Sequence, residues 1–242
     1  MEFMSSLRRK KWRESTLDGD ATRSKIPEII LGGQDGVVNV LGLVLGVAAS
    51  TMNSQVVIVA GLATTVAESL SMAAVAYTST RAAQDYYRYT VKKEEKEIRK
   101  QPRKAASELR SLFHSKGVRG KLLSDIVKAL EKNVRAGGET ITEEGMHLQK
   151  SGRSEPWTAA FIVGLSSTIG SLIPLIPFFF LPVVQAMIAA AILALVSLFV
   201  GGWIKAKLTV GSPTRSGLEL VVAGGLAALG GFIIGSLLQV PV

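Results

Sequence analysis

The sequence predicts an all-α polytopic membrane protein with five transmembrane helices and a small three-helix cytosolic insertion between helices two and three. The first observation is composition, because 48% of the 242 residues are hydrophobic although the formal net charge is +9. The second is that all 28 Lys and Arg residues are confined to three stretches, residues 8–25, 81–153 and 205–215. The third is five apolar runs, each close to the roughly 20 residues that a helix needs to cross a bilayer. These runs cover residues 29–49, 56–77, 157–173, 182–204 and 216–238.

The distribution of basic residues predicts the orientation of the chain. Lys and Arg collect in the short loops on the cytosolic side of a membrane, and the turns near 50–55 and 174–182 have none. We therefore expect a cytosolic N-terminus, a cytosolic insertion and a C-terminus outside. The positive charge then reflects topology and attraction to anionic membrane lipid, and no nucleic-acid partner is expected. A prokaryotic cell membrane is favoured because the chain is compact and lacks an evident sorting extension, with a vacuolar membrane as the alternative.

The chain divides into four segments. These are a cytosolic N-terminal tail over 1–25, helices one and two over 26–82, a cytosolic stalk and candidate metal-binding domain over 83–156, and helices three to five over 157–242. Helix one begins near Pro27, since proline is tolerated in the first turn of a helix. Its glycines recur at four-residue spacing, as in Gly32 and Gly36, which lets helix backbones approach closely in lipid.

The insertion is predicted to be helical throughout. Neither Gly nor Pro interrupts the chain from Leu62 to Gln101, so helix two should continue into the cytosol as a stalk. Three short helices should follow, over about 103–116, around 122–130 and over 142–150, with Gly137–Gly138 ending the second of them. Their apolar residues are too few for a large independent core, and we expect partner helices from a second copy of the chain to stabilise them.

Polar residues on helices one and two are the first candidate site. Asp35 and Asn39 are four residues apart and share a face of helix one, as do Glu68 and Met72 on helix two. Ionisable groups within a membrane are costly and by default mark a pathway or a binding site. A carboxylate with a thioether suits a first-row transition ion better than Mg²⁺ or Ca²⁺. The alternatives are structural hydrogen bonds for the acids and simple packing for Met72.

The acidic residues of the insertion are a weaker candidate. Glu94 and Glu97 share one face of the stalk, and further glutamates follow along the insertion. Carboxylates at helical spacing can gather oxygens around a cation. Lys and Arg are interleaved with them, however, as in KKEEKEIRK. From spacing alone, a solvated face with salt bridges is favoured over a metal site.

Several enzyme classes are excluded by what the sequence lacks. An intramembrane aspartyl protease needs two membrane aspartates and only Asp35 is available, and a rhomboid-like protease needs a membrane histidine, whereas His114 and His147 lie in the insertion. No GxxxxGK[ST] phosphate loop is present, and the absence of cysteine removes disulfides and thiolate ligands. We expect no enzyme activity and no tightly bound cofactor.

The segments GGQDGVVNVLGLVLGVAAS and GLATTVAESLSMAAVAYTS, together with IPLIPFFF and KAKLTVGSPTRSGLEL, resemble the vacuolar iron transporter family over nearly the whole chain. This resemblance implies a five-helix homodimer with its cation path between the protomers, which exchanges cytosolic Fe²⁺, and sometimes Mn²⁺ or other divalent ions, for protons. Asp35 matches the aspartate of helix one in that family, and Glu68 and Met72 match its helix-two motif. The resemblance therefore implies iron homeostasis as the setting.

The resemblance also implies that the insertion binds metal, although some of its residues differ from those of the family pattern. Its implied ligands in this chain are Glu94, Glu97 and Glu108, with Glu144 and its neighbour Glu143 as candidates for a later glutamate. Ala105 stands where the family has a second paired glutamate, and Thr140 stands where it has a methionine, for which Met146 is a shifted substitute. The insertion is thus poorer in acid and richer in Lys and Arg than the family pattern.

Three functions remain open at this point. The first is a proton-coupled antiporter in which Asp35 and Glu68 bind either a divalent metal or protons. The second is a passive divalent-cation channel, which the sequence does not separate from the exchanger. The third is a non-transporting membrane scaffold or metal sensor, against which the two membrane acids argue, since a mere anchor would avoid them.

Overall fold

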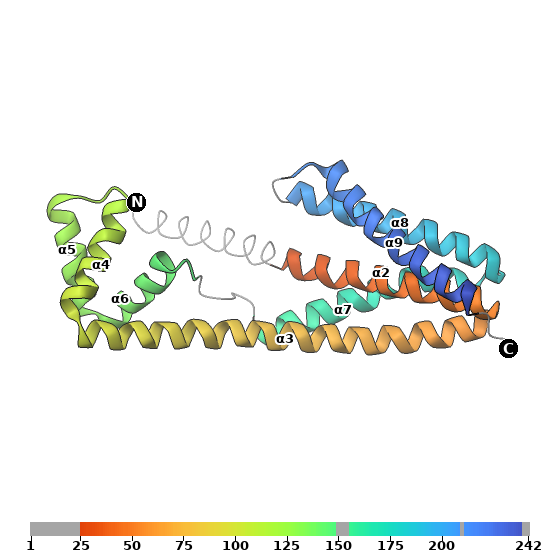
Figure 1. Cartoon of the computed structure of the whole chain (residues 1–242), viewed down its shortest axis with the longest axis horizontal. Helices are drawn as coiled ribbons and strands as arrows, with labels where there is room; N and C mark the ends of the chain where they lie inside the picture. Colours follow the sequence, from red (N-terminus) through yellow and green to blue (C-terminus); the bar gives the residue numbers. More distant parts are fainter. Residues whose placement is uncertain (1–24, 149–154, 209–210, 239–242) are drawn as a thin grey trace, which may run out of the picture. The chain divides into compact units, whose positions relative to one another are not determined.

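A computed structural model describes residues 25–148, 155–208 and 211–238, and within these ranges the chain forms helices and no strand (Figure 1). The helices are α2 (Ile26–Thr51), α3 (Ser54–Lys100), α4 (Pro102–Ser115), α5 (Gly120–Lys132), α6 (Val134–Thr140), the π-helix η1 (Ile141–Gly145), α7 (Pro156–Leu175), the 3₁₀-helix η2 (Ile176–Phe179), α8 (Val183–Leu208) and α9 (Pro213–Leu237). The predicted tail covers residues 1–25, of which 1–24 lie outside the described residues.

Five of the described segments are long and apolar enough to cross a membrane, which confirms the predicted fold class. They are Ile26–Thr51, Ser54–Lys100, Pro156–Phe179, Val183–Leu208 and Pro213–Leu237. The chain separates into two compact units, which share helix α3. We call residues 25–77 with 155–238 the membrane unit, and residues 78–148 the insertion unit.

Helix α2 is the centre of the membrane unit, where it packs against α7, α8 and α9 (Figure 1). Glycines make these contacts close, as their spacing predicts. A Cβ atom on Gly42 would lie 3.1 Å from the carbonyl oxygen of Ala227 in α9, and one on Gly231 would collide with the carbonyl oxygen of Gly42. Because lipid supplies no hydrophobic drive between helices, such backbone approach is what lets van der Waals contact hold them together.

The proline-rich turn between the third and fourth spans differs from expectation. Helix α7 runs two residues beyond the predicted end and contains Pro174, and η2 then continues the helical path over Ile176–Phe179. Pro174 is buried, and its missing N–H is tolerated within one turn of the helix end, where the hydrogen-bonding pattern changes to 3₁₀. The prolines therefore redirect the chain through a second short helix rather than a plain loop.

The insertion unit begins with the second half of α3, which confirms that this helix runs without interruption to Lys100. With 47 residues at ~1.5 Å each, α3 is about 70 Å long. Pro102 starts α4, and the unit has a small core of six buried residues. These are Ile98, Ala105, Leu109, Leu123, Val127 and Ile141.

Two predictions for the insertion are wrong. Gly137 and Gly138 lie inside α6, and the chain breaks instead at Asn133, whose side-chain oxygen accepts a hydrogen bond from the Ala136 N–H at 3.2 Å. The glycines serve close packing, because a Cβ on Gly138 would lie 3.2 Å from the carbonyl oxygen of Val91 in α3. The helix predicted over 142–150 is replaced by η1 and a non-helical segment at 146–148, while 149–150 lie outside the described residues.

Candidate functional site

The polar residues predicted on the first two membrane helices meet in the membrane unit. The Asn39 side-chain amide of α2 donates a hydrogen bond to Glu68 Oε1 of α3 at 3.0 Å. Asp35 precedes Asn39 by one turn and lies close enough to Glu68 for their carboxylates to interact electrostatically. The four-residue spacing that predicted a shared face on α2 therefore orients both side chains toward the acid of α3.

Helix α7 adds two hydroxyl groups that sequence reasoning missed. Ser167 and Ser171 are fully buried, and neither side-chain oxygen has a hydrogen-bond partner among the described residues. Ser171 lies near Glu68, whose Oε2 is also without a partner there. Gly36 permits the approach of α7, since a Cβ at this position would lie 2.8 Å from Ser171 Oγ. Buried polar atoms normally have partners, so this cluster is poised to accept an ion, a proton or water.

Met72 follows Glu68 by one turn of α3 and is half-buried. It shares the face of Glu68 by helical spacing. Among the described residues, no group of three or more Asp, Glu or His side chains is arranged to hold a metal ion. Asn39 is exposed on the surface of the single chain. The single chain thus brings two carboxylates, an amide and two hydroxyls to one region of the membrane unit, without three acidic side chains placed around one metal position.

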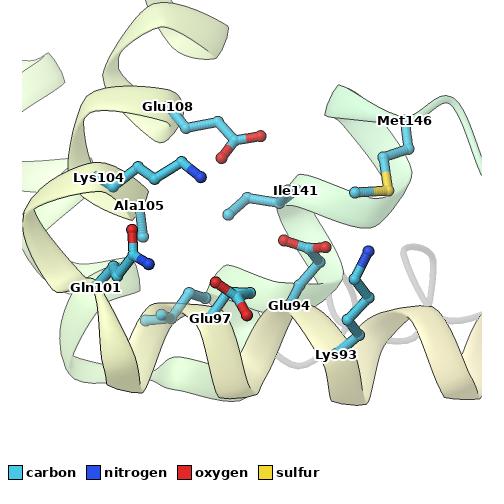
Figure 2. A pocket seen from close by; sticks show the side chains of 10 residues that line it. Lys93, Glu94, Glu97, Gln101, Lys104, Ala105, Glu108, Ile141 and Met146 are labelled. Carbon is cyan, nitrogen blue, oxygen red and sulfur yellow. The ribbon is translucent and has the colours of Figure 1, made fainter.

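The second candidate site is a pocket of about 260 Å³ in the insertion unit, between α3, α4 and η1 (Figure 2). Three predicted ligands line it, namely Glu94 and Glu97 of α3 and Glu108 of α4. The thioether of Met146 reaches the same space, although helical spacing did not predict it. Met146 follows η1 in the non-helical segment, so its position depends on the π-helical turn.

Charge in this pocket is mixed. Lys93 and Lys104 also line it, and none of the three pocket glutamates forms a hydrogen bond or ion pair with another described residue. Glu94 is only 7% exposed. Burial raises the pKa of the Glu94 carboxyl, and Glu108 and Glu97 raise it further, while the two lysines act in the opposite direction.

The remaining predicted ligands of the insertion lie elsewhere. Glu144 forms an ion pair with Lys116, and Glu143 accepts a hydrogen bond from the hydroxyl of Tyr87. Neither glutamate lines the pocket. Burial, and then the hydrogen bond to Glu143, raises the pKa of the Tyr87 phenol above its ordinary value. The structure therefore separates the implied ligand set into a pocket group and a pair with partners of its own.

The two departures from the family pattern have structural roles. Ala105 is buried in the core of the insertion unit, beside the pocket. The Thr140 hydroxyl donates a hydrogen bond to the carbonyl oxygen of Ala136 at 2.8 Å, within its own helix. Neither side chain offers the pocket a ligand.

Comparison with known proteins assigns the chain to a family. The sequence model of the VIT family matches residues 26–236. The chain belongs to the VIT family, the vacuolar iron transporters. The match spans both membrane acids, Asp35 and Glu68, and the insertion of this VIT-family chain.

Curated relatives extend over most of this VIT-family chain. Vacuolar iron transporter 1 of Arabidopsis thaliana is 27% identical over 215 residues, which cover 88% of this chain and 86% of the relative. Vacuolar iron transporter 1 of Eucalyptus grandis is 28% identical over 86% of this chain and 84% of its own length. Protein CCC1 of Saccharomyces cerevisiae is 27% identical over 84% of this chain and 66% of its own length. Relatives named for the vacuole give no support to the prokaryotic membrane favoured by sequence.

Proposed function

We propose that this protein is a proton-coupled divalent-metal transporter that exports cytosolic Fe²⁺, and also Mn²⁺ or related ions, in exchange for H⁺. The observation that carries the proposal is the contact between Asp35, Asn39 and Glu68 within the membrane unit. Membership of the VIT family and the names of the relatives support iron as the substrate.

Competition for the same carboxylates would couple the two fluxes. One divalent ion and two protons carry the same charge, so Asp35 and Glu68 can exchange one for the other without leaving net charge in the membrane. The Asn39 amide holds one Glu68 oxygen and leaves the other free to bind a metal ion or a proton. Alternating exposure of this site to the two sides would then drive metal export from the proton gradient without ATP.

A second copy of the chain would complete the site. Asn39 is exposed in the single protomer, and α3 presents large exposed apolar side chains at helical spacing. These include Val59, Leu62, Val66 and Leu70. A homodimer that pairs these faces would bring two sets of carboxylates together and supply the ligands that one protomer lacks. In the proposed topology the insertion and the N-terminus are cytosolic and the C-terminus is outside.

The insertion pocket would serve as a cytosolic metal-capture site. Glu94, Glu97 and Glu108 line the pocket and would supply oxygen ligands once their carboxylates converge, because the structure does not place three acidic side chains around one metal position in the described residues. Met146 would supply a soft thioether that favours a transition ion over Mg²⁺ or Ca²⁺. Its lysines lower the affinity that three carboxylates would otherwise give. The membrane site carries transport, and the pocket would adjust how readily metal reaches it.

Uptake into proteoliposomes with an internal pH probe tests the proposal. We expect Fe²⁺ entry to be matched by proton exit, and both to be lost in Asp35→Asn. The matched control is Glu219→Gln, which removes an exposed acid of α9 that pairs with Arg215 and should leave transport unchanged. Metal entry that is indifferent to the proton gradient would indicate a channel. No entry of Fe²⁺, Mn²⁺, Co²⁺ or Zn²⁺ would favour the scaffold or sensor.

A further inference from the structure

Two serines of α7 differ from other hydroxyl residues of the membrane unit in what their side chains bond. Serine and threonine within a helix commonly donate to a carbonyl oxygen of the preceding turn. Thr65 of α3 and Ser197 of α8 do so, each at 2.8 Å. Ser167 and Ser171 are fully buried, and neither Oγ has a partner among the described residues. These two hydroxyls are therefore available to another group.

The Ser171 hydroxyl lies where α7 meets the two helices that carry the membrane acids. A Cβ on Gly36 of α2 would lie 2.8 Å from Ser171 Oγ, so this oxygen faces the turn of α2 that contains Asp35. Ser171 also lies near the Glu68 carboxylate of α3, whose Oε2 is buried without a partner in the described residues. Buried oxygens without partners are costly, and here a carboxylate oxygen and a hydroxyl oxygen of this kind lie near each other.

Contacts between α7 and α3 hold this arrangement in place. The hydroxyl oxygens of Thr168 and Ser69 are 2.9 Å apart. One turn away, a Cβ on Gly164 would lie 3.2 Å from the carbonyl oxygen of Ser69. Because Ser69 directly follows Glu68, these contacts fix the α7 hydroxyls against the turn of α3 that carries the acid.

Neutral oxygens suit a site that already has two carboxylates. A hydroxyl oxygen has two lone pairs and can bind a divalent ion as a water molecule does, so it replaces hydration without adding charge. Asp35 and Glu68 already balance the charge of one divalent ion, and a third acid would oppose release of the ion, which transport requires. The described residues place no third acidic side chain beside these two, so the additional oxygens that α7 offers are hydroxyls.

We propose that Ser167 and Ser171 are specificity-determining residues of the membrane site, whose hydroxyl oxygens bind the transported divalent cation together with Glu68. The inference rests on the proposed transport function and adds α7 to a cation path that otherwise involves α2 and α3. Ser171 acts beside Glu68. Ser167 lies one turn closer to the cytosolic end of α7 in the proposed topology and binds the ion on its way to Glu68. Oxygen ligands of this kind favour Mn²⁺ over ions that prefer sulfur.

Replacing one oxygen with sulfur tests direct binding. The chain contains no cysteine, so Ser171→Cys introduces its single thiol. In proteoliposomes we expect uptake of Zn²⁺ relative to Mn²⁺ to rise by about tenfold, since thiolate favours Zn²⁺ and oxygen favours Mn²⁺. In nanodiscs, Co²⁺ bound to the same variant should show the charge-transfer absorption of a Co²⁺–thiolate bond. Ser197→Cys is the matched control, because the Ser197 hydroxyl donates to Ala194 of its own helix, and it should show neither change.

The spectrum decides between the ion and a bound water. Co²⁺ that binds Ser171→Cys without the thiolate absorption would overturn the proposal, even if transport were altered, because the serine would then hold water beside Glu68. Equal absorption in Ser197→Cys would reduce the signal to unspecific thiol binding and would also overturn it. Absence of metal uptake by the unmodified chain would reject the proposed transport function instead, and the spectrum of Ser171→Cys would still report separately on the ligand.

Alanine variants separate binding from packing, because they keep the small volume that α7 needs and remove only the oxygen. Ser171→Ala should raise the Mn²⁺ concentration for half-maximal uptake by about tenfold, as for groups that support a metal ligand, and Ser167→Ala should raise it by less. The midpoint of thermal unfolding in detergent should not fall in either variant, since each loses a buried hydroxyl that has no partner. An unchanged half-maximal concentration in both variants would mean that the serines only pack, and would overturn the proposal.

Discussion

The membrane unit and the insertion unit each hold a group of carboxylates, and they compensate the negative charge in different ways. In the membrane unit, Glu68 accepts a hydrogen bond from Asn39, and no Lys or Arg occurs between residues 26 and 77. In the insertion pocket, Lys93 and Lys104 accompany the glutamates, which form no hydrogen bond with described residues. The membrane acids therefore have no Lys or Arg on their own two spans, whereas the pocket has two lysines in its lining. This difference in charge is what the variants below are designed to test.

The largest expected effect separates the two sites by function. Glu68→Gln should reduce metal uptake to the level of protein-free liposomes, because the amide removes a charge that no neighbouring group replaces. Glu94→Gln should leave the maximal uptake rate intact and change only its dependence on metal concentration. Rates measured over a range of Fe²⁺ concentrations distinguish these outcomes. If Glu94→Gln abolished uptake as Glu68→Gln does, the two sites would have to be parts of one pathway.

Close backbone packing joins α2 and α9 in the membrane unit, and adjacent glycines of α9 provide a direct test. A Cβ on Gly231 would collide with the carbonyl oxygen of Gly42, whereas nothing lies within 4 Å of one on Gly230. Gly231→Ala should destabilise the protein by about 3 kcal/mol or more, since overpacking against backbone has no flexible side chain to relieve it. Gly230→Ala should be neutral or stabilising by a few tenths of a kcal/mol. Thermal unfolding in detergent gives both values, and equal effects would contradict the close contact of α2 with α9.

Asn39→Ala examines whether the amide positions Glu68. Loss of the hydrogen bond frees Glu68 to move and should weaken the apparent metal affinity by about 10- to 100-fold, as for other groups that orient a ligand. Stability should fall by only about 1 kcal/mol. Two quantities are measured separately, the Fe²⁺ concentration that gives half-maximal uptake and the maximal rate of uptake. A purely structural defect would lower the maximal rate, because less transporter is folded, without shifting that concentration. Asn39→Gln, which keeps an amide, should recover part of the affinity.

Much of the fold can be predicted from sequence because a membrane-spanning helix must have a minimum length and an apolar composition. Apolar runs of spanning length predicted five helices, and the lack of Gly or Pro between Leu62 and Gln101 predicted the continuous α3. Apart from the helical turn at Pro174, the misassigned elements lie in the insertion, where Gly137 and Gly138 pack inside α6 instead of ending a helix. Local propensity predicts a break at paired glycines, but tertiary contact with α3 outweighs it.

In the candidate sites too, local spacing was predictable from the sequence and contacts between distant segments were not. Helical spacing, four residues for Asp35 and Asn39 and three for Glu94 and Glu97, placed each pair on one face of its helix, and the members of each pair lie near a common partner or pocket. It could not reveal that Lys116 and Tyr87 engage the glutamates of η1, because those contacts join segments far apart in the sequence. Ser167 and Ser171 were also missed. Serines are common in membrane helices, so only their complete burial without partners marks them.

The smallest expected effect concerns the contact that removes Glu143 from the pocket. Tyr87→Phe should destabilise the insertion unit by about 1 kcal/mol, because Glu143 loses a hydrogen bond from the buried phenol. Tyr89→Phe, at an exposed phenol on the same helix, is the control and should have no measurable effect. Amide hydrogen exchange of α6 and η1 would localise the loss. If Glu143 instead turned toward the pocket, Co²⁺ affinity would rise in Tyr87→Phe.

The same contact predicts a loss of stability at alkaline pH. The pKa of the Tyr87 phenol is raised in the folded protein, first by burial and then by Glu143, so the folded state retains a proton that the unfolded state releases above a pH of about 10. The stabilisation is therefore complete below that pH and is lost progressively as the pH rises beyond it. Unfolding of the insertion unit followed from pH 9 to 11 should show this decline in the unmodified chain. The decline should be shallower in Tyr87→Phe, which has no phenolic proton to lose, and equal slopes would mean that Tyr87 ionises as freely in the folded state as in the unfolded one.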